Sequence, residues 1–296
     1  MKGLIVGDSL GQKLAKKINW DFIPLEERIF PDAELQPKLE KEKKRDKIIF
    51  ILQKRNRENI NSYLVKYFLL SRKLKDLAKK VIGIMPYFPY ARQDSVFREG
   101  EPLSALYIAE LIEKNLDVFI TCNMHEHRKK IGDLFKIPAY NIFLFEYLAK
   151  HFKNFNPKNS LVIGPDKEAE TFVKNFRRGF PAKMAILKKE RDLKTGKIKF
   201  LSTEELKPII KNKEIIIVDD MVSTAGTITE AAKIVSKMKP KSISFAFVHP
   251  VFGNKSINAL KKLKPKKIVC TNTIENNQYK TDISDCLKNF FINFNF

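Results

Sequence analysis

The feature that most constrains the fold is an alternation, along the whole 296-residue chain, of short apolar runs with segments of helical periodicity. The apolar runs are rich in Ile, Val and Phe and do not alternate with polar residues, which is typical of strands buried on both faces of a parallel sheet. Amphipathic segments lie at Ser104–Glu113, Phe143–His151 and Thr227–Met238. The expected strands are Gly3–Val6, Ile48–Leu52, Val81–Met85, Val118–Thr121, Leu161–Ile163, Ala185–Leu187, Ile215–Val218, Ser244–Val248 and Ile268–Cys270.

This alternation predicts right-handed βαβ units and a doubly wound α/β architecture with mainly parallel sheets. Nine strands are many for one such sheet, and the polar segment Lys150–Ser160 is interpreted as a linker. We therefore expect two domains of similar size, residues 1–149 and residues 150–296.

The composition narrows the class of protein. Lys and Arg number 56 against 34 Asp and Glu, a net charge of +22, and such an excess attracts phosphate groups. Most of it is Lys spread along the chain, which favours a solvated surface over a nucleic-acid interface. The three cysteines, Cys122, Cys270 and Cys286, are too few and too far apart for a disulfide scaffold or a structural zinc site. The chain has no apolar run of the roughly 18–20 residues that span a bilayer and no signal-peptide core, so we expect a soluble, cytoplasmic protein without a membrane partner.

The segment that most clearly carries chemistry is Glu214–Thr227, EIIIVDDMVSTAGT. A buried strand runs into Asp219 and Asp220, and a loop and a helix follow. Backbone N–H groups of a loop of small residues can approach a phosphate closely, and the following helix directs its positive end at the same anion. The acids could accept hydrogen bonds from sugar hydroxyls or hold hydrated Mg²⁺. The alternative is a strand-to-helix turn with capping hydroxyls. The loop consists of Ser223, Thr224, Ala225, Gly226 and Thr227.

The stretch VDDMVSTAGT resembles the phosphoribosyl-pyrophosphate (PRPP) binding loop that PRPP synthetases share with type I phosphoribosyltransferases. The order of the other motifs over nearly the whole chain is similar to ribose-phosphate diphosphokinase, and the NMHEH and GPDK forms resemble its archaeal branch. These motifs are FPDAE (Phe30–Glu34), PYFPYARQD (Pro86–Asp94), GEPLSA (Gly100–Ala105), NMHEH (Asn123–His127), GPDKEAE (Gly164–Glu170) and KKERDLKTGK (Lys188–Lys197).

The resemblance implies two phosphoribosyltransferase-like domains, the N-terminal one on the ATP side and the C-terminal one on the ribose 5-phosphate side with a mobile flap. It implies the reaction ATP + ribose 5-phosphate → PRPP + AMP, a step of nucleotide biosynthesis. It also implies Mg²⁺ as the cofactor and a homo-oligomer of at least two subunits, with nucleic acid not expected as a partner.

The resemblance assigns the ATP site to two segments. Phe30, with Asp32 and Glu34, would hold the adenine from a neighbouring subunit, although Phe30 taken alone could be an ordinary core aromatic. Arg92 and Gln93 would reach the nucleotide, since an Arg on a strand-end loop suits phosphate. Asp94, which ends this motif, would orient Arg92.

The metal, the flap and the sugar phosphate are assigned in the same way. His125 and Asp166 would hold the Mg²⁺ of ATP, although His125 could be a surface histidine and His127 is close enough to confuse the assignment. Lys189 and Arg191 would be the catalytic pair on the flap, which without the resemblance we would interpret as a solvated hairpin with a Thr195–Gly196 turn. Ribose 5-phosphate would be bound by Arg191, Asp219, Asp220, Ser223, Thr224, Ala225, Gly226 and Thr227.

The chain departs from the family pattern at two places where Gly is common, because it has Ala33 and Glu168. The larger acidic side chain of Glu168 could crowd the metal or the ribose. Asn123 replaces the Asp of bacterial members but fits the archaeal pattern. The competing hypotheses are a phosphoribosyltransferase that consumes PRPP, a non-catalytic regulatory homologue, and a basic nucleic-acid binder that kept the fold. The upstream motifs and total length argue against the first, and the retained Lys189 and Arg191 against the second.

Overall fold

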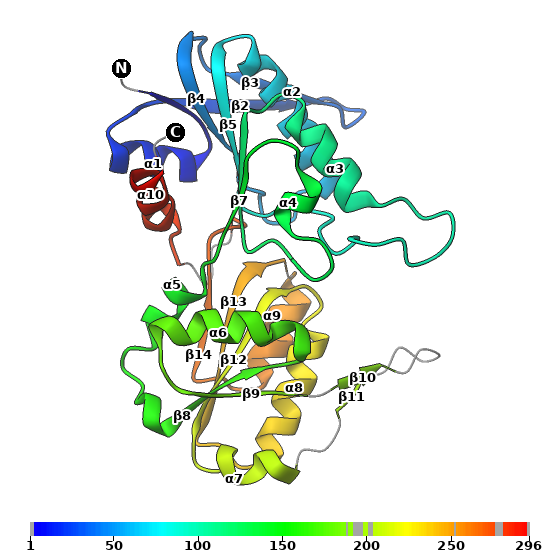
Figure 1. Cartoon of the computed structure of the whole chain (residues 1–296), viewed down its shortest axis with the longest axis vertical. Coiled ribbons are helices and arrows are strands. Elements are labelled where there is room, and N and C mark those ends of the chain that lie inside the picture. The colour runs from blue at the N-terminus through cyan, green and yellow to red at the C-terminus, as the bar shows by residue number, and fades with distance from the viewer. Residues whose placement is uncertain are drawn as a thin grey trace. The chain divides into compact units, whose positions relative to one another are not determined.

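The computed structural model describes residues 3–187, 189–191, 198–200, 204–251, 253–275 and 281–294. The chain divides into two compact units (Figure 1). Unit 1 comprises residues 1–142, 273–275 and 283–296, and unit 2 comprises residues 143–272 and 276–282. The chain therefore returns to unit 1 near its C-terminus.

Unit 1 is built on a seven-stranded sheet in the order β3-β2-β1-β4-β5-β6-β7. Neighbouring strands are parallel except for the antiparallel hairpin β2–β3 at one edge. The strands are β1 (Leu4–Gly7), β2 (Asp21–Ile29), β3 (Leu35–Leu39), β4 (Arg45–Ile51), β5 (Ala78–Met85), β6 (Val118–Cys122) and β7 (Ala139–Ile142).

Helices cover both faces of this sheet, α1 and α10 on one and α2 and α3 on the other (Figure 1). The central strands are buried on both faces, as their uninterrupted apolar runs predict. The helices are α1 (Ser9–Ile18), α2 (Ile60–Lys75), α3 (Ser104–Glu113), α4 (Ile131–Leu134) and α10 (Ser284–Asn293).

Unit 2 contains a five-stranded parallel sheet in the order β14-β13-β12-β8-β9 and a separate two-stranded antiparallel hairpin, β10–β11. Helices α5 and α6 lie on one face of the sheet, and α8 and α9 on the other (Figure 1). The strands are β8 (Ser160–Gly164), β9 (Lys183–Ile186), β10 (Lys189–Arg191), β11 (Ile198–Phe200), β12 (Glu214–Val222), β13 (Ser242–Pro250) and β14 (Lys267–Cys270). The helices are α5 (Phe145–Ala149), α6 (Glu170–Gly179), α7 (Lys207–Ile210), α8 (Gly226–Lys237) and α9 (Asn254–Lys262), with short 3₁₀ turns at η1 (Lys150–Phe152), η2 (Pro157–Asn159), η3 (Lys167–Ala169) and η4 (Glu204–Leu206).

The predicted α/β class with mainly parallel sheets is confirmed, and each of the nine expected strands is present. The segment Lys150–Ser160 differs from its interpretation as a polar linker. Phe152 is fully buried and Phe155 is 8% exposed, so two aromatic side chains anchor this segment in unit 2. The chain first leaves unit 1 at residue 142, and α10 packs against α1 rather than within the C-terminal half.

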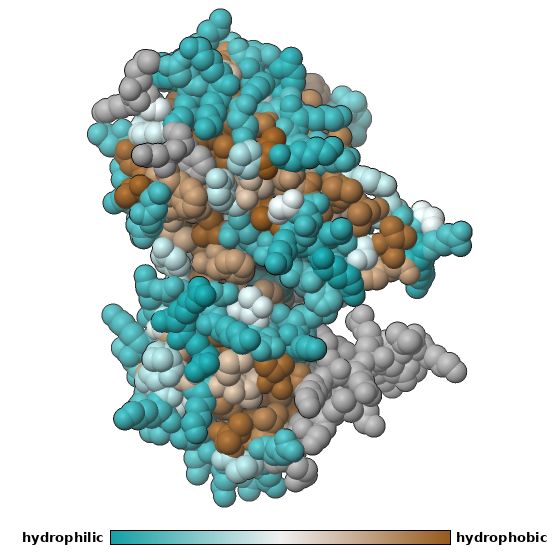
Figure 2. Space-filling view, viewed as in Figure 1, coloured by the Kyte–Doolittle hydropathy of each residue, from teal (hydrophilic) through white to brown (hydrophobic). Residues whose placement is uncertain are grey.

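Hydrophilic residues cover most of the face shown in Figure 2, and apolar residues gather on it in patches. Among the described residues, no helix is long and apolar enough to cross a membrane.

Candidate functional site

The carboxyl end of β12 carries the acidic pair. The strand extends through both residues, because its pairing with β13 continues beyond Val218 to Val222. Asp219 is half-buried and accepts a hydrogen bond from the Asp220 N–H at 3.0 Å, while Asp220 is 4% exposed and accepts one from the Met221 N–H at 2.6 Å. Backbone N–H groups therefore orient both carboxylates.

The loop after β12 leads directly into α8. Ala225 adopts a left-handed conformation (φ 62°) and makes no side-chain capping bond. Gly226 begins the helix, and a Cβ there would lie 3.6 Å from the Thr224 hydroxyl, an ordinary van der Waals distance. The Thr224 hydroxyl receives only a long bond, 3.5 Å, from the Gly226 N–H. An N-terminus of a 12-residue helix that is so sparsely capped is suited to bind an anion. Ser223 and Thr227 are half-buried on either side of it.

Asp166 follows β8, the strand that neighbours β12 in the sheet. After β8 the chain continues to β9 on one side of the pair, and after β12 it continues to β13 on the other side. Ligands of such sheets bind in the crevice at the strand ends where the direction of the connections changes. The Asp166 carboxylate is 8% exposed and accepts bonds from the N–H groups of Glu168 (2.9 Å) and Ala169 (3.2 Å). Since η3 contacts β12, the structure brings Asp166 to the same end of the sheet as Asp219 and Asp220. Glu168 itself is exposed.

Phe30, Asp32 and Glu34 lie at the tip of the β2–β3 hairpin. The turn is closed by bonds from the Phe30 N–H to the Glu34 carbonyl and from the Ala33 N–H to the Phe30 carbonyl, both 2.9 Å. The Asp32 side chain accepts the Glu34 N–H at 3.1 Å. Ala33 has φ 71°, the left-handed region that favours Gly, which explains why Gly suits this position. Phe30 is half-buried beneath the Arg28 guanidinium, 4.6 Å from its ring centre.

Arg92 and Gln93 lie on the long connection between β5 and α3 and are both exposed. A turn holds this segment in place, because the Gln93 N–H bonds to the Tyr90 carbonyl (2.8 Å) and its own carbonyl accepts the Ala105 N–H (3.1 Å). Asp94 is 2% exposed and binds Arg128. The predicted orienting of Arg92 by Asp94 is therefore not what the structure shows.

His125 lies on the loop after β6, the strand beside β5. Its side chain is partly exposed, His127 is exposed, and the ring centres of the two histidines are 6.3 Å apart. Asn123 begins the loop in a left-handed conformation (φ 40°), and Asn141 accepts the Met124 N–H at 2.9 Å. Unit 1 thus brings His125, Arg92 and Gln93 together at one end of its sheet.

Lys189 and Arg191 lie in β10, which pairs antiparallel with β11 in the register Lys189↔Phe200 and Arg191↔Ile198. This agrees with the hairpin expected for the flap. The side chains of both residues, and the Thr195–Gly196 turn, lie outside what the structure describes.

The donor set fits Mg²⁺ better than a metal held by protein alone. Within the described ranges, no three His, Cys, Asp or Glu side chains gather as a metal cluster. Mg²⁺ is typically bound by one or two protein ligands together with substrate phosphates and waters. The side chains of His125 and of Asp166 are each of a type that could serve as such a ligand.

A cavity of about 580 Å³ at the carboxyl ends of β1 and β4 has no counterpart in the sequence-based predictions. Asp8 follows β1 and caps α1 by accepting the Leu10 N–H at 3.0 Å, and it also accepts the Gln53 N–H. Burial raises the pKa of Asp8 to about 6, and the negative charge of the nearby Glu275 raises it further. Three backbone hydrogen bonds to the carboxylate act in the opposite direction and lower the pKa. A strand followed by Asp-Ser and an amphipathic helix was the one local signal for this site.

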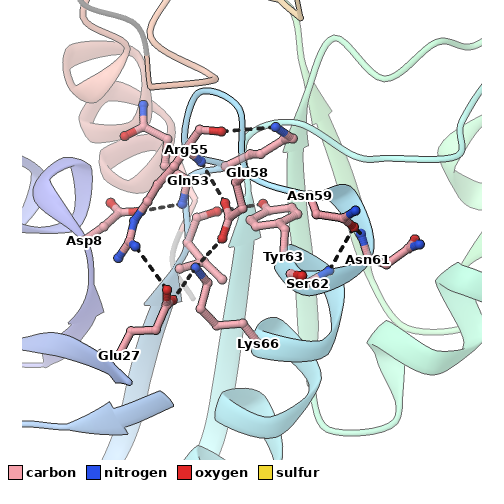
Figure 3. A network of polar contacts seen from close by, with 12 residues as sticks. Asp8, Glu27, Gln53, Arg55, Glu58, Asn59, Asn61, Ser62, Tyr63 and Lys66 are labelled. Atoms are coloured by element: carbon pink, nitrogen blue, oxygen red, sulfur yellow. Dashed lines mark hydrogen bonds and ion pairs between the residues drawn. The ribbon is translucent and has the colours of Figure 1, made fainter. Parts of the chain in front are cut away.

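The same cavity is bordered by a buried ionic network (Figure 3). The Lys66 ammonium, 3% exposed, contacts Glu27 at 2.7 Å and also contacts Glu58. Arg55 adds a bond to Glu27 at 3.2 Å, and its N–H donates to Glu58 at 2.9 Å. These residues come from β2, α2 and the loop after β4, so their proximity could not be predicted from local sequence.

The fold and this distribution of side chains define a class: two phosphoribosyltransferase-type α/β units, with an acidic pair and a sparsely capped helix start in the second. Two family models agree, the N-terminal domain of ribose phosphate pyrophosphokinase over residues 6–115 and the phosphoribosyl transferase domain over residues 131–284.

The chain belongs to the ribose-phosphate pyrophosphokinase family. It is 30% identical to the ribose-phosphate pyrophosphokinase of Methanobrevibacter smithii, with 97% of this chain and 99% of that protein covered. It is 26% identical to the enzyme of the same name from Saccharolobus solfataricus, over 93% and 94% of the two chains. The crystal structure of phosphoribosylpyrophosphate synthetase from Mycobacterium smegmatis shares the fold, with a TM-score of 0.83, 20% identity and 99% and 98% coverage. The predicted family, its archaeal relatives and the enzyme class are confirmed.

Proposed function

We propose that this chain transfers the β,γ-diphosphoryl group of ATP to O1 of ribose 5-phosphate, giving PRPP and AMP, with Mg²⁺ as cofactor and as a homo-oligomer of at least two subunits. The observation that carries the proposal is that both family domains match, in order, a chain with an acidic pair and a sparsely capped helix start at one strand end. A phosphoribosyltransferase would not need the N-terminal domain.

In the proposed reaction O1 attacks the β-phosphorus, the bond between that phosphorus and the oxygen bridging to the α-phosphorus breaks, and AMP leaves in line. The O1 proton passes to solvent, since no general base stands out. Such transfers depend mainly on positioning and charge stabilisation. Mg²⁺ would neutralise charge on the ATP oxygens.

The sugar phosphate is assigned to unit 2. Its 5-phosphate is held by the N–H groups of the loop Ser223–Thr227, and Asp219 and Asp220 grip the ribose 2- and 3-hydroxyls. This assignment is supported by the buried, backbone-oriented carboxylates and by the helix start directly after them. Arg191 adds a contact to ribose 5-phosphate when the flap closes, and Lys189 contacts transferring oxygens.

The nucleotide is assigned to unit 1. Arg92 and Gln93 contact its phosphates, His125 and Asp166 are ligands of its Mg²⁺, and Phe30, Asp32 and Glu34 of a neighbouring subunit hold its adenine. Neighbouring strands carry the Arg92 and His125 loops, which supports their joint use.

The direct test is to incubate the purified chain with ATP, ribose 5-phosphate and Mg²⁺ and to follow AMP and PRPP by chromatography. We expect equal amounts of both products. Production of a nucleotide from added PRPP and a free base, without AMP from ATP, would instead identify a phosphoribosyltransferase. No turnover of either kind would identify a non-catalytic homologue.

A further inference from the structure

Two loops of unit 1 come from the neighbouring parallel strands β5 and β6. The first, residues 86–103, carries Arg92 and Gln93 and is called the arginine loop. The second, residues 123–130, carries His125 and is called the histidine loop. Because the proposed function needs both loops to hold one molecule of ATP with its metal, their relative position matters for the reaction.

A buried carboxylate joins the two loops. Asp94, on the arginine loop, is 2% exposed and accepts the backbone N–H of Arg128 at 2.8 Å and the guanidinium Nη1 of the same residue at 3.3 Å. A carboxylate this deeply buried requires such partners, since an unpaired one would be costly. The residues are 34 positions apart, so the contact is a tertiary link between loops.

The histidine loop is held at its other end by a different strand. Asn141, in β7, accepts the Met124 N–H at 2.9 Å, and the Asn123 N–H donates to the Ile142 carbonyl at 2.9 Å. His125 therefore lies between an anchor on β7 and an anchor on the arginine loop. The second anchor relates its position to Arg92 and Gln93.

Arg128 makes a weaker second link. Its guanidinium carbon lies 5.0 Å from the ring centre of Phe97, also on the arginine loop, but the arginine side chain is 48% exposed. Exposed contacts of this kind contribute little, whereas the bond from the Arg128 N–H ends on a buried charge. The backbone bond is therefore the main link, and removing Asp94 should matter more than shortening Arg128.

We propose that Asp94 is a positioning residue, which ties the arginine loop to the histidine loop and thereby sets where His125 meets the metal of ATP. This inference rests on the proposed function and deepens it. Asp94 does not itself contact substrate. It differs from the role expected from the sequence, in which Asp94 orients Arg92.

The test compares Asp94→Ala, Asp94→Asn and Arg128→Ala with the control Asp133→Asn. Asp133 accepts the Lys130 N–H at 2.8 Å, and so caps α4 without linking the two loops. For Asp94→Ala we expect the Mg²⁺ concentration for half-maximal activity and the KM for ATP to rise about tenfold, which is the effect of losing a hydrogen bond to a charged group. The KM for ribose 5-phosphate should stay within about twofold of the wild-type value. Asp94→Asn, which keeps an acceptor oxygen, should show a smaller shift, and Arg128→Ala smaller still.

If the Mg²⁺ requirement and the KM for ATP are unchanged in Asp94→Ala, the proposal is wrong. It is also wrong if the KM values for both substrates rise equally and the Tm falls, because that result indicates a merely structural role. If Asp94→Ala does not fold, Asp94→Asn must show the same selective shift. Calorimetric binding of Mg²⁺·ATP to each variant keeps the test separate from turnover. If the wild-type chain makes no AMP, the proposed function fails, while weaker Mg²⁺·ATP binding by Asp94→Ala than by Asp133→Asn would still support the link.

Discussion

At the scale of single residues, four of the motifs assigned to a substrate or a metal contain a non-glycine residue with positive φ, as do five described positions elsewhere in the chain. Ala33, Tyr90, Asn123 and Ala225 are non-glycine residues with positive φ, and each lies in a motif assigned to a substrate or a metal. Such conformations cost free energy and persist where the surrounding structure demands them. The sequence predicts these motifs because each is contiguous, although the strain itself is visible only in the structure.

The acidic pair leads to the first prediction at this scale. Asp220→Asn removes a charge that we assign to the ribose hydroxyls, but Asn retains an oxygen for the Met221 N–H. We expect the KM for ribose 5-phosphate to rise about tenfold or more while the Tm changes little. Steady-state kinetics with each substrate varied in turn would measure this, with the exposed Glu230→Gln on α8 as the control. An unchanged KM for ribose 5-phosphate would remove Asp220 from the site.

Asp8 leads to a prediction about pH. Its pKa is raised, mainly by burial, from 3.8 to about 6. The folded chain therefore binds this proton more tightly than the unfolded chain, so the stability from this group is complete below about pH 4 and is lost as pH rises towards 6. Asp8→Asn cannot ionise and still caps α1. Urea unfolding measures the free energy of unfolding of both chains. The value for the variant minus that for the wild type should increase by on the order of 2 kcal/mol from pH 4 to pH 7. A difference that does not change with pH would contradict this prediction.

At the scale of elements, the sequence predicts strands whose residues are uniformly apolar and misses strands that mix apolar and polar residues. The central strands were found because burial on both faces requires unbroken apolar runs. Strands β2 and β3 were missed because β2 is partly exposed and β3 alternates, with Gln36 and Lys38 on its exposed side. The link from Asp94 to Arg128 was missed because nothing local indicates a contact across 34 residues.

The β10–β11 hairpin is the element on which the catalytic pair is assigned. If Lys189 acts on charge that develops during transfer, Lys189→Ala should lower kcat by about two orders of magnitude or more and change either KM much less. Rapid-quench and steady-state measurements of AMP formation would test this. A loss confined to KM would refute the role. Lys199→Ala on the partner strand β11 is the matched control and should retain activity.

The β2–β3 hairpin is joined to α2 through Lys66. Lys66→Met leaves Glu27 and Glu58, each 11% exposed, without their shared buried cation. We expect a loss of about 3–5 kcal/mol in the free energy of unfolding, because the two nearly buried carboxylates would keep only the more exposed Arg55 as a partner, and poorly compensated buried charge is costly. Adding Glu58→Gln to the Lys66→Met variant should recover part of the lost free energy of unfolding. The exposed pair Lys38 and Glu26 is the control, and Lys38→Met should cost under about 1 kcal/mol. Equal losses in the two single variants would contradict the burial argument.

At the scale of the whole molecule, the arrangement of unit 1 bears on why the chain should assemble. The β2–β3 hairpin is at one edge of the sheet, and β1 and β4 separate β2 from β5, which leads to Arg92. With strands about 4.8 Å apart, the hairpin and the arginine loop begin more than about 14 Å from each other. This separation supports our proposal that Phe30 and the exposed hairpin tip serve the adenine site of another subunit.

A shared site predicts complementation between two inactive variants. Phe30→Ala and Arg92→Ala homo-oligomers should each have low activity. In a mixed dimer one site receives Phe30 from one subunit and Arg92 from the other, so both residues are intact there, and random mixing should restore about a quarter of the wild-type activity. Co-expression with two affinity tags and an AMP assay would measure this. Arg92→Ala mixed with Gln93→Ala is the matched control, because both residues come from the same loop and no site regains both. No recovery in the first mixture would contradict an adenine site divided between subunits, and equal recovery in the control would mean that recovery does not report on such a site.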